Sequence, residues 1–468
     1  MNPEEFFNSL VDYEKIPGYN YKLEDFIEFL TKFDSPQKKL NNVIHIAGTK
    51  GKGSTAAMIS SCLESCGYRV GLFTSPHLQK INERIKINNI EISNQDLMKY
   101  IKLIKPYIKR KHGASPVKYR KLSGASSIKH HEFHGVSTFF EVLTMVAFLH
   151  FLKKKTDFSI LEVGLGGRLD STNVTHPIIS VITKIGYDHT DLLGNKLSQI
   201  AREKAGIIKP PPFPPPQMGE DKGGGKVITI STQQACSRLI TIHQRSSVEQ
   251  VIKRVAKKQH NKIIFAEDQH NIKILKQSLK GSYLKINGEI GKFNTFLPLP
   301  GKHQIENLLI AMSVLNELRK KGYTITEPAI QNGIKQTDLH GRFEVLSKNP
   351  LLIYDCAHND DSFEALGNNL RLLKTKKFSL IFGCKKNKDI QYCLKNIFPR
   401  AQEVVLVKAF DPPGMEPHKI YKRAKKYQKN LTIASSVKDA IEYLKTKNSN
   451  NTAIIITGTF YLWNEIGN

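Results

Sequence analysis

The chain has 468 residues, of which 40% are hydrophobic and 24% are charged, and 70 Lys+Arg against 42 Asp+Glu give a net charge of +28. This length exceeds what one ordinary core accommodates and predicts two or three domains. No apolar run approaches the ~20 residues that a bilayer-spanning helix needs, and the acidic first residues are unlike a signal or transit peptide. We therefore expect a cytoplasmic protein that does not act at a membrane.

The excess of positive charge fits a solvated basic surface, and it also fits attraction to nucleic acid or to small polyanions such as nucleotides and polycarboxylates. No RNP, zinc-finger or helix-turn-helix signature accompanies the charge, so we expect no nucleic-acid partner. The six cysteines form no CxxC pair. Reduced, structural cysteines are the prediction.

Strand-like apolar runs alternate with helical patterns through the first half of the chain. This alternation predicts a mainly parallel sheet with helices on both faces. In chain order we expect a strand at 41–48, a helix at 54–67, a strand at 69–75, a helix at 138–155, and strands at 158–165 and 178–186.

A hairpin signal and a second βα series follow. Asn287-Gly288 lies between alternating residues at 282–297, which predicts a hairpin turn there, and a helix is expected at 303–322. The sequence predicts a first domain over 1–338 and a smaller Rossmann-like α/β domain over 339–468. Strands of the second domain are expected at 351–357, 378–384, 403–410, 431–436 and 453–459.

Two segments have the composition of insertions. Residues 105–131 hold eight Lys/Arg and no acid, and 210–225 are a proline block running into a glycine block. Both are predicted to be exposed loops, and 210–225 to be dispensable. The histidine cluster at 130–134 lies at the end of the basic segment, where a solvated loop is favoured over a metal site.

The stretch "GTKGKGST" at 48–55 lies between a predicted strand and a predicted helix. Backbone N–H groups and the helix dipole cradle phosphate in such an arrangement, and glycines permit close approach to the ligand. Lysine can neutralise phosphate charge, and a Ser or Thr hydroxyl can bind phosphate or its Mg²⁺. We therefore predict an ATP-binding loop made of Gly48, Thr49, Lys50, Gly51, Lys52, Gly53, Ser54 and Thr55.

Polar side chains also follow the next two predicted strands. Glu162 ends one strand and His189 follows the other, so both are expected at the carboxyl edge of the sheet, where ligands bind in open α/β folds. Carboxylate, imidazole and hydroxyl groups suit Mg²⁺ that keeps several waters. His189 alone would be taken for a loop histidine; the loop and Glu162 favour a metal site.

An ordered set of motifs resembles the folylpolyglutamate synthase and dihydrofolate synthase family of the Mur ligase superfamily. The set covers nearly the whole chain. It consists of the loop, FTSPHL (73–78), FFEVLTMVAF (139–148), LEVGLGGRLDSTNV (161–174), GYDHTDLLG (186–194), REKAGIIK (202–209), HGRFE (340–344), DCAHN (355–359) and TGTFYL (457–462).

The resemblance implies ATP-driven amide formation through an acyl phosphate, with ATP, L-glutamate and dihydropteroate or a reduced folate as substrates and with Mg²⁺. It implies that Ser75, Glu162 and His189 bind magnesium and that Lys204 is carbamylated. Arg342, Asp355 and Asn307 would contact the nucleotide. Lys52, Lys204, Arg342 and His358 would be the catalytic residues.

The resemblance also places the pterin or folate against the first domain. Three short stretches are implicated: Asn20, Tyr21, Lys22 and Leu23; Thr138, Phe139, Phe140 and Glu141; and Leu169, Asp170 and Ser171. Three positions depart from the family pattern. Cys356 and Asp360 replace Gly and Pro around His358, and Asp25 replaces an Arg near the first stretch.

Three functions stay open at this stage. The form GGRLDSTN at 166–173 favours a bifunctional dihydrofolate synthase/folylpolyglutamate synthase. A folylpolyglutamate synthase alone is the alternative, and a basic P-loop ATPase acting on nucleic acid is a remote one. We expect a monomer.

Overall fold

The computed structural model describes residues 2–10, 22–108, 138–211, 237–373, 377–386, 388–409, 414–447 and 452–466. Residues 109–131 of the predicted basic loop, 212–225 of the predicted proline and glycine loop, and the whole histidine cluster 130–134 lie outside the described residues. Asn20 and Tyr21 also lie outside them.

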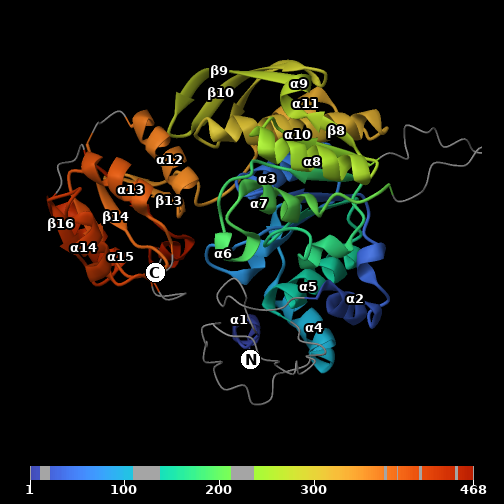
Figure 1. The fold of residues 1–468 in the computed structure, drawn as a ribbon, viewed down its shortest axis with the longest axis horizontal. Helices are drawn as coiled ribbons and strands as arrows, with labels where there is room; N and C mark the ends of the chain where they lie inside the picture. Colours follow the sequence, from blue (N-terminus) through green and yellow to red (C-terminus); the bar gives the residue numbers. More distant parts are fainter. Residues whose placement is uncertain are drawn as a thin grey trace, which may run out of the picture.

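An eight-stranded sheet organises the first half of the molecule (Figure 1). The strand order is β4-β3-β2-β5-β1-β6-β7-β8, and the run from β2 to β8 is parallel, whereas β3 and β4 are antiparallel. The strands are β1 (Val43–Ala47), β2 (Val70–Phe73), β3 (Ile85–Ile87), β4 (Ile90–Glu91), β5 (Phe158–Glu162), β6 (Ile179–Ile182), β7 (Arg238–Thr241) and β8 (Lys262–Phe265).

Helices cover both faces of this sheet, because alternate side chains of its buried strands point to opposite faces. Ile44 and Ile46 of β1 pack with α3, α10 and α11, whereas Val43 packs with α1, α2, α4 and α5 on the other face. The helices are α1 (Pro3–Asn8), α2 (Leu23–Thr31), α3 (Lys52–Ser65), α4 (Asn94–Ile104), α5 (Phe139–Lys153), α6 (Thr190–Leu193), α7 (Leu197–Ala205), α8 (Ser246–Lys258), α9 (Ala266–Gln269), α10 (His303–Lys320) and α11 (Glu327–Lys335).

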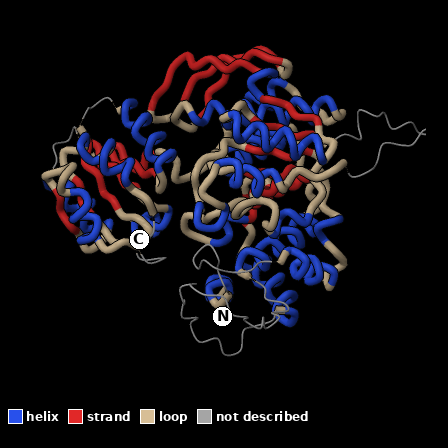
Figure 2. Tube along the Cα trace, viewed as in Figure 1, coloured by secondary structure: helices blue, strands red, loops and turns tan. Residues whose placement is uncertain are grey.

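A three-stranded antiparallel sheet of β9 (His270–Ser278), β10 (Gly281–Gly288) and β11 (Gly291–Leu297) joins the same core, and Figure 2 shows its strands at the top of the molecule. The predicted hairpin exists, but its turn was placed wrongly. Asn287 pairs with Lys292 and Gly288 with Gly291, so the turn is at 289–290, two residues later than predicted. Burial of Ile290 in the core sets this register.

The second domain is a six-stranded sheet in the order β12-β13-β17-β14-β15-β16, with only its edge strand β12 antiparallel. The strands are β12 (Glu344–Lys348), β13 (Leu351–Asp355), β14 (Phe378–Phe382), β15 (Val404–Leu406), β16 (Leu431–Ile433) and β17 (Ala453–Thr457). The helices are α12 (Asp360–Asn369), α13 (Gln391–Asn396), α14 (Pro417–Ala424) and α15 (Val437–Lys447).

The predicted fold class is confirmed: a mainly parallel α/β domain carries a phosphate-type loop and precedes a smaller Rossmann-like domain. The boundary at 338/339 stays a prediction. Within the described ranges, no helix combines the length and apolarity that crossing a membrane requires. The five cysteines in those ranges are free thiols, as predicted.

Candidate active site

The loop between β1 and α3 is held by backbone and side-chain contacts to the segment after β6. The N–H groups of Thr49 and Lys50 both donate to the carbonyl oxygen of Lys184, at 2.9 and 3.1 Å. The Thr49 hydroxyl donates to the carbonyl oxygen of Gly186 at 3.1 Å. The helix begins at Lys52, two residues earlier than predicted, after Gly51 in the left-handed region at φ 85°.

Two glycines of the loop have no room for a side chain. A Cβ on Gly48 would lie 1.8 Å from Thr183 Oγ1, and a Cβ on Gly51 would lie 2.0 Å from Asn307 Oδ1. The buried Asn307 is held in place because its Nδ2 donates to Gln304 Oε1 at 2.9 Å. The structure thus brings the predicted Asn307 of α10 directly against the loop.

Glu162 ends β5 beside the loop, as predicted from the strand pattern. Its carboxylate is buried, accepts a hydrogen bond from the Ser75 N–H at 3.1 Å and lies 3.9 Å from Lys52 Nζ. Burial raises the pKa of Glu162, and the charge of Lys52 opposes this shift. The structure therefore places Lys52, Ser75 and Glu162 together.

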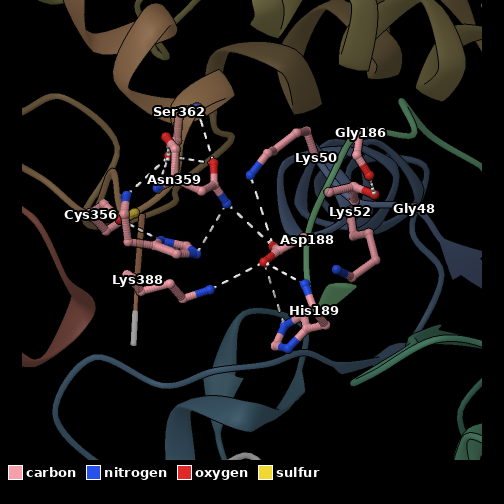
Figure 3. A network of polar contacts seen from close by, with 12 residues as sticks. Gly48, Lys50, Lys52, Gly186, Asp188, His189, Cys356, Asn359, Ser362 and Lys388 are labelled. Atoms are coloured by element: carbon pink, nitrogen blue, oxygen red, sulfur yellow. Dashed lines mark hydrogen bonds and ion pairs between the residues drawn. The ribbon is translucent and has the colours of Figure 1, made fainter. Parts of the chain in front are cut away.

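Asp188 lies beside the loop lysines and contacts four groups (Figure 3). Its oxygens accept from Lys388 Nζ at 3.1 Å, Asn359 Nδ2 at 3.3 Å and the His189 N–H at 3.1 Å, and Lys50 Nζ is 4.0 Å away. Burial acts to raise the pKa of Asp188. The charges of His189, Lys50 and Lys388 outweigh burial and hold that pKa well below its usual range.

His189 itself has an unusual backbone and a partly exposed ring. Its φ is 49°, and its Nε2 lies 3.9 Å from Asp188 Oδ1. Burial lowers the pKa of the ring, which favours the neutral imidazole. In the ranges described, no three His, Cys, Asp or Glu side chains form a metal-binding group. The predicted magnesium set, Ser75, Glu162 and His189, is not a group of this kind, because one of its three ligands is a serine hydroxyl.

Lys204 is buried behind the loop. Its Nζ donates to the carbonyl oxygen of Gly48 at 2.9 Å. Burial and the charge of Lys52 lower the pKa of Lys204 to about 7, and burial similarly lowers the pKa of Lys50 to about 8. A large fraction of Lys204 is therefore a neutral amine near neutral pH.

The second domain brings His358 and Asn359 to this cluster from the start of α12. His358 Nδ1 lies 2.9 Å from the carbonyl oxygen of Cys356, and burial lowers the pKa of the ring to about 3. Asn359 caps α12 by accepting from the Ser362 N–H and donates across the domain junction to Asp188. Cys356 is buried, so the family's glycine is replaced without exposing the thiol.

Arg342 and Asp355 lie at the junction, where the charge of Arg342 also acts on Glu162 of the first domain. Arg342 donates to Cys356 Sγ and lies over the Phe460 ring at 5.2 Å. The carboxylate of Asp355 accepts from the backbone N–H groups of Phe343 and Ala357, each at 2.9 Å. Burial raises the pKa of Asp355 to about 6 against the charge of Arg342.

The predicted pterin-contact residues of α5 have clear structural partners. Thr138 and Glu141 cap the helix reciprocally. Phe139 packs edge-on against Phe7, with Arg84 5.0 Å above its ring, and Phe140 lies so close to Gly164 that a Cβ there would be 2.6 Å from Phe140 Cζ.

The remaining predicted pterin contacts lie at the start of α2 and in the turn after β5. Lys22 and Leu23 begin α2, and Leu169 is exposed. Asp170 and Ser171 are buried, and Asp170 accepts from the N–H groups of Leu165 and Thr172 at 2.9 and 3.0 Å.

Sequence reasoning missed three polar residues of the site. Asp188 directly precedes the predicted ligand His189, and its acidic side chain next to that histidine was an available signal. No signal in the sequence pointed to Lys388 or Arg84. Lys388 lies among other lysines, and Arg84 is the last residue of a short 3-10 helix and is buried near Glu162.

A loop rich in glycine and lysine between a strand and a helix of a parallel sheet, facing a second α/β domain, is the arrangement of a two-domain protein that binds nucleotide phosphates. The family described as "Mur ligase, glutamate ligase domain" matches residues 341–460. The chain is 30% identical to the dihydrofolate synthase/folylpolyglutamate synthase of Bacillus subtilis, over 94% of this chain and 92% of that protein.

Solved structures agree. The folylpolyglutamate synthase of Thermotoga maritima has a TM-score of 0.76 at 29% identity, covering 98% of this chain and 94% of that one. The Mycobacterium tuberculosis folylpolyglutamate synthase complexed with ADP has a TM-score of 0.80 at 26% identity, covering 98% and 96%. The chain belongs to the dihydrofolate synthase/folylpolyglutamate synthase family and is an ATP-dependent ligase.

Gly51→Ala is expected to weaken ATP binding by about 10-fold or more, because the new Cβ displaces Asn307 and strains a left-handed residue. Isothermal titration with ATP measures the effect. Gly67→Ala is the matched control: its φ is also positive, at 89°, but no atom lies within 4 Å of the added Cβ. Equal losses of affinity in both variants would contradict the assignment.

Proposed function

We propose that the protein uses ATP to join L-glutamate to dihydropteroate and to the γ-glutamyl tail of a reduced folate. The observation that carries this proposal is a contact across the domain junction: Asn359 of the second domain donates to Asp188, whose carboxylate lies 4.0 Å from Lys50 of the loop. The name of the Bacillus subtilis relative contains both activities, which supports a bifunctional enzyme.

The chemistry requires a substrate carboxylate to become a good electrophile. Its oxygen attacks the γ-phosphorus of ATP, ADP leaves, and an acyl phosphate forms. The glutamate amine then attacks the acyl carbon, loses a proton, and phosphate leaves with the C–O bond electrons. Lys50 and Lys52 neutralise phosphate charge during both steps. The contact between the domains excludes water that would hydrolyse the acyl phosphate.

The residues beside the loop suit a magnesium ion. Glu162 is a buried carboxylate with Lys52 at 3.9 Å and with the charges of Arg342 and Arg84 nearby, and it accepts a hydrogen bond from the Ser75 N–H. Oxygen donors of this kind are the ligands that Mg²⁺ prefers. We propose that Glu162, Ser75 and His189 hold Mg²⁺, which when bound neutralises charge on the phosphates.

Arg342, Asp355 and Asn307 are the proposed nucleotide contacts, and Arg342 and His358 remain proposed catalytic residues. The proposed pterin residues stay as predicted; of these, Phe140 packs against Gly164, two residues after Glu162. A monomeric state and a cytoplasmic location also stay predictions.

The function is tested by ATP-dependent incorporation of labelled glutamate with dihydropteroate, tetrahydrofolate or no acceptor. We expect product with both acceptors. Product with tetrahydrofolate alone would leave folylpolyglutamate synthase as the function, and no product with either acceptor would contradict the proposal.

Lys52→Ala should reduce kcat/KM by about 100-fold or more, because a preorganised phosphate contact is lost. Lys257→Ala, at an exposed lysine of α8, is the control and should match the wild type.

Glu162→Gln should raise the Mg²⁺ concentration that gives half-maximal activity by about 10-fold or more, since it removes a charge at nearly constant shape. A magnesium titration of the activity measures this. Glu203→Gln is the control, because Glu203 pairs with Arg168 at 3.1 Å on the surface. A Glu162→Gln titration that overlays the wild type would rule out Glu162 as a ligand.

Lys204 is proposed to take up CO₂ as a carbamate, since its pKa of about 7 leaves a nucleophilic amine. Protonated amines do not react, so the carbamate should increase from about pH 6 to about pH 8. The measurement is the carbamate carbon signal in NMR of protein equilibrated with carbon-13 bicarbonate. Lys204→Arg should lack the signal and Lys209→Arg should retain it; a signal that persists in Lys204→Arg belongs to another lysine.

A further inference from the structure

The carboxylate of Asp188 joins three parts of the molecule that are far apart in sequence. It accepts hydrogen bonds from Lys388 and Asn359 of the second domain and lies 4.0 Å from Lys50 of the loop (Figure 3). The Asp188 side chain is largely shielded from solvent, since only 13% of it is exposed. One buried carboxylate therefore contacts both domains at once.

The backbone around Asp188 is fixed to the same loop. The carbonyl oxygen of Lys184, two residues after β6, accepts from two loop N–H groups, and that of Gly186 accepts from the Thr49 hydroxyl. On its other side this segment packs tightly on α12, because a Cβ on Gly186 would lie 2.3 Å from Asp361 Oδ2. Residues 184–189 are thus held between the loop and the second domain.

Charge explains why a carboxylate is needed there. Lys50 and Lys388 approach each other from opposite domains. The charge of Lys388 acts to lower the pKa of Lys50, and both charges act to lower the pKa of His358. Asp188 contacts both lysines, whereas Glu162 contacts Lys52. Without the Asp188 charge, Lys50 and Lys388 would repel each other across the junction and oppose the contact between the domains.

We propose that Asp188 is a positioning residue that couples docking of the second domain to the phosphate-binding loop. It holds Lys388 and Asn359 beside the loop, and so keeps the adjacent His358 motif next to the site of phosphate transfer. When phosphate binds at the loop, the Lys50 ammonium moves its contact from the Asp188 carboxylate to the phosphate. Asp188 keeps its hydrogen bonds with Lys388 and Asn359, so the second domain stays docked. This role rests on the proposed placement of ATP phosphates at Lys50 and Lys52.

The first test uses Asp188→Asn, which removes the charge and keeps the shape. We expect kcat for ligation to fall about 10- to 100-fold, while ATP affinity changes less than about threefold. Small-angle X-ray scattering of the full chain should give a larger radius of gyration than the wild type. An unchanged radius of gyration with lost kcat would overturn the proposal, and so would wild-type kcat.

The second test is a double-mutant cycle with Lys388→Met. Each single variant should lower kcat about 10-fold or more, and the double variant should be no slower than the slower single one, because the two residues act through one contact. Lys386→Met is the matched control, an exposed lysine two residues away that should match the wild type in kcat and scattering. Multiplicative losses in the double variant would overturn the coupling.

The two proposals fail separately. If neither acceptor gives product, the proposed function is wrong. If product forms with the wild type but Asp188→Asn and Lys388→Met keep the wild-type radius of gyration, only the coupling is wrong.

Discussion

The parallel pairing of β5, β1 and β6 is the constraint on which the rest of the site depends. Ile46 pairs with Glu162 on one side, and Ala47 pairs with Ile182 on the other, so three consecutive carboxyl ends lie at one edge. The loop follows the central strand, Glu162 ends one neighbour, and Asp188 and His189 follow the other. A sheet with these strands in another order would separate the loop from both acidic groups.

This edge concentrates positive charge that must be compensated. Lys50, Lys52 and Lys204 lie around the loop, and burial lowers the pKa values of Lys50 and Lys204. Acidic partners are distributed among them: Glu162 lies near Lys52 and Asp188 near Lys50. Burial lowers the pKa values of Lys50 and Lys204 in spite of these acids, so a bound polyanion such as ATP adds to the compensation. The site is thus built for an anionic ligand.

The second domain completes the site through few polar side chains. Two other junction residues have contacts within their own domain: Asp355 accepts from backbone N–H groups, and Arg342 contacts Cys356 and Phe460. Asn359 and Lys388 are the residues that reach Asp188. A junction that relies on such contacts can open and close without loss of either core, as expected for an ATP-dependent ligase that must admit its substrates.

The sequence by itself predicted β1, β2, β5 and β6 of the first sheet, helices α3, α5 and α10, and β13 to β17 of the second domain. It also predicted a mainly parallel α/β fold followed by a smaller one, the phosphate-type loop and the place of Glu162 at a strand end. These depend on local hydrophobic periodicity and on glycine at positions that exclude a side chain. It did not determine the hairpin register, which burial of Ile290 decided over the Asn287-Gly288 turn signal. Nor did it determine that Asp188 meets Lys388, residues separated by 200 positions, or that Lys204 lies behind Gly48 with a lowered pKa. Those features depend on burial and on distances between segments far apart in the chain, which only the packing of the two domains sets.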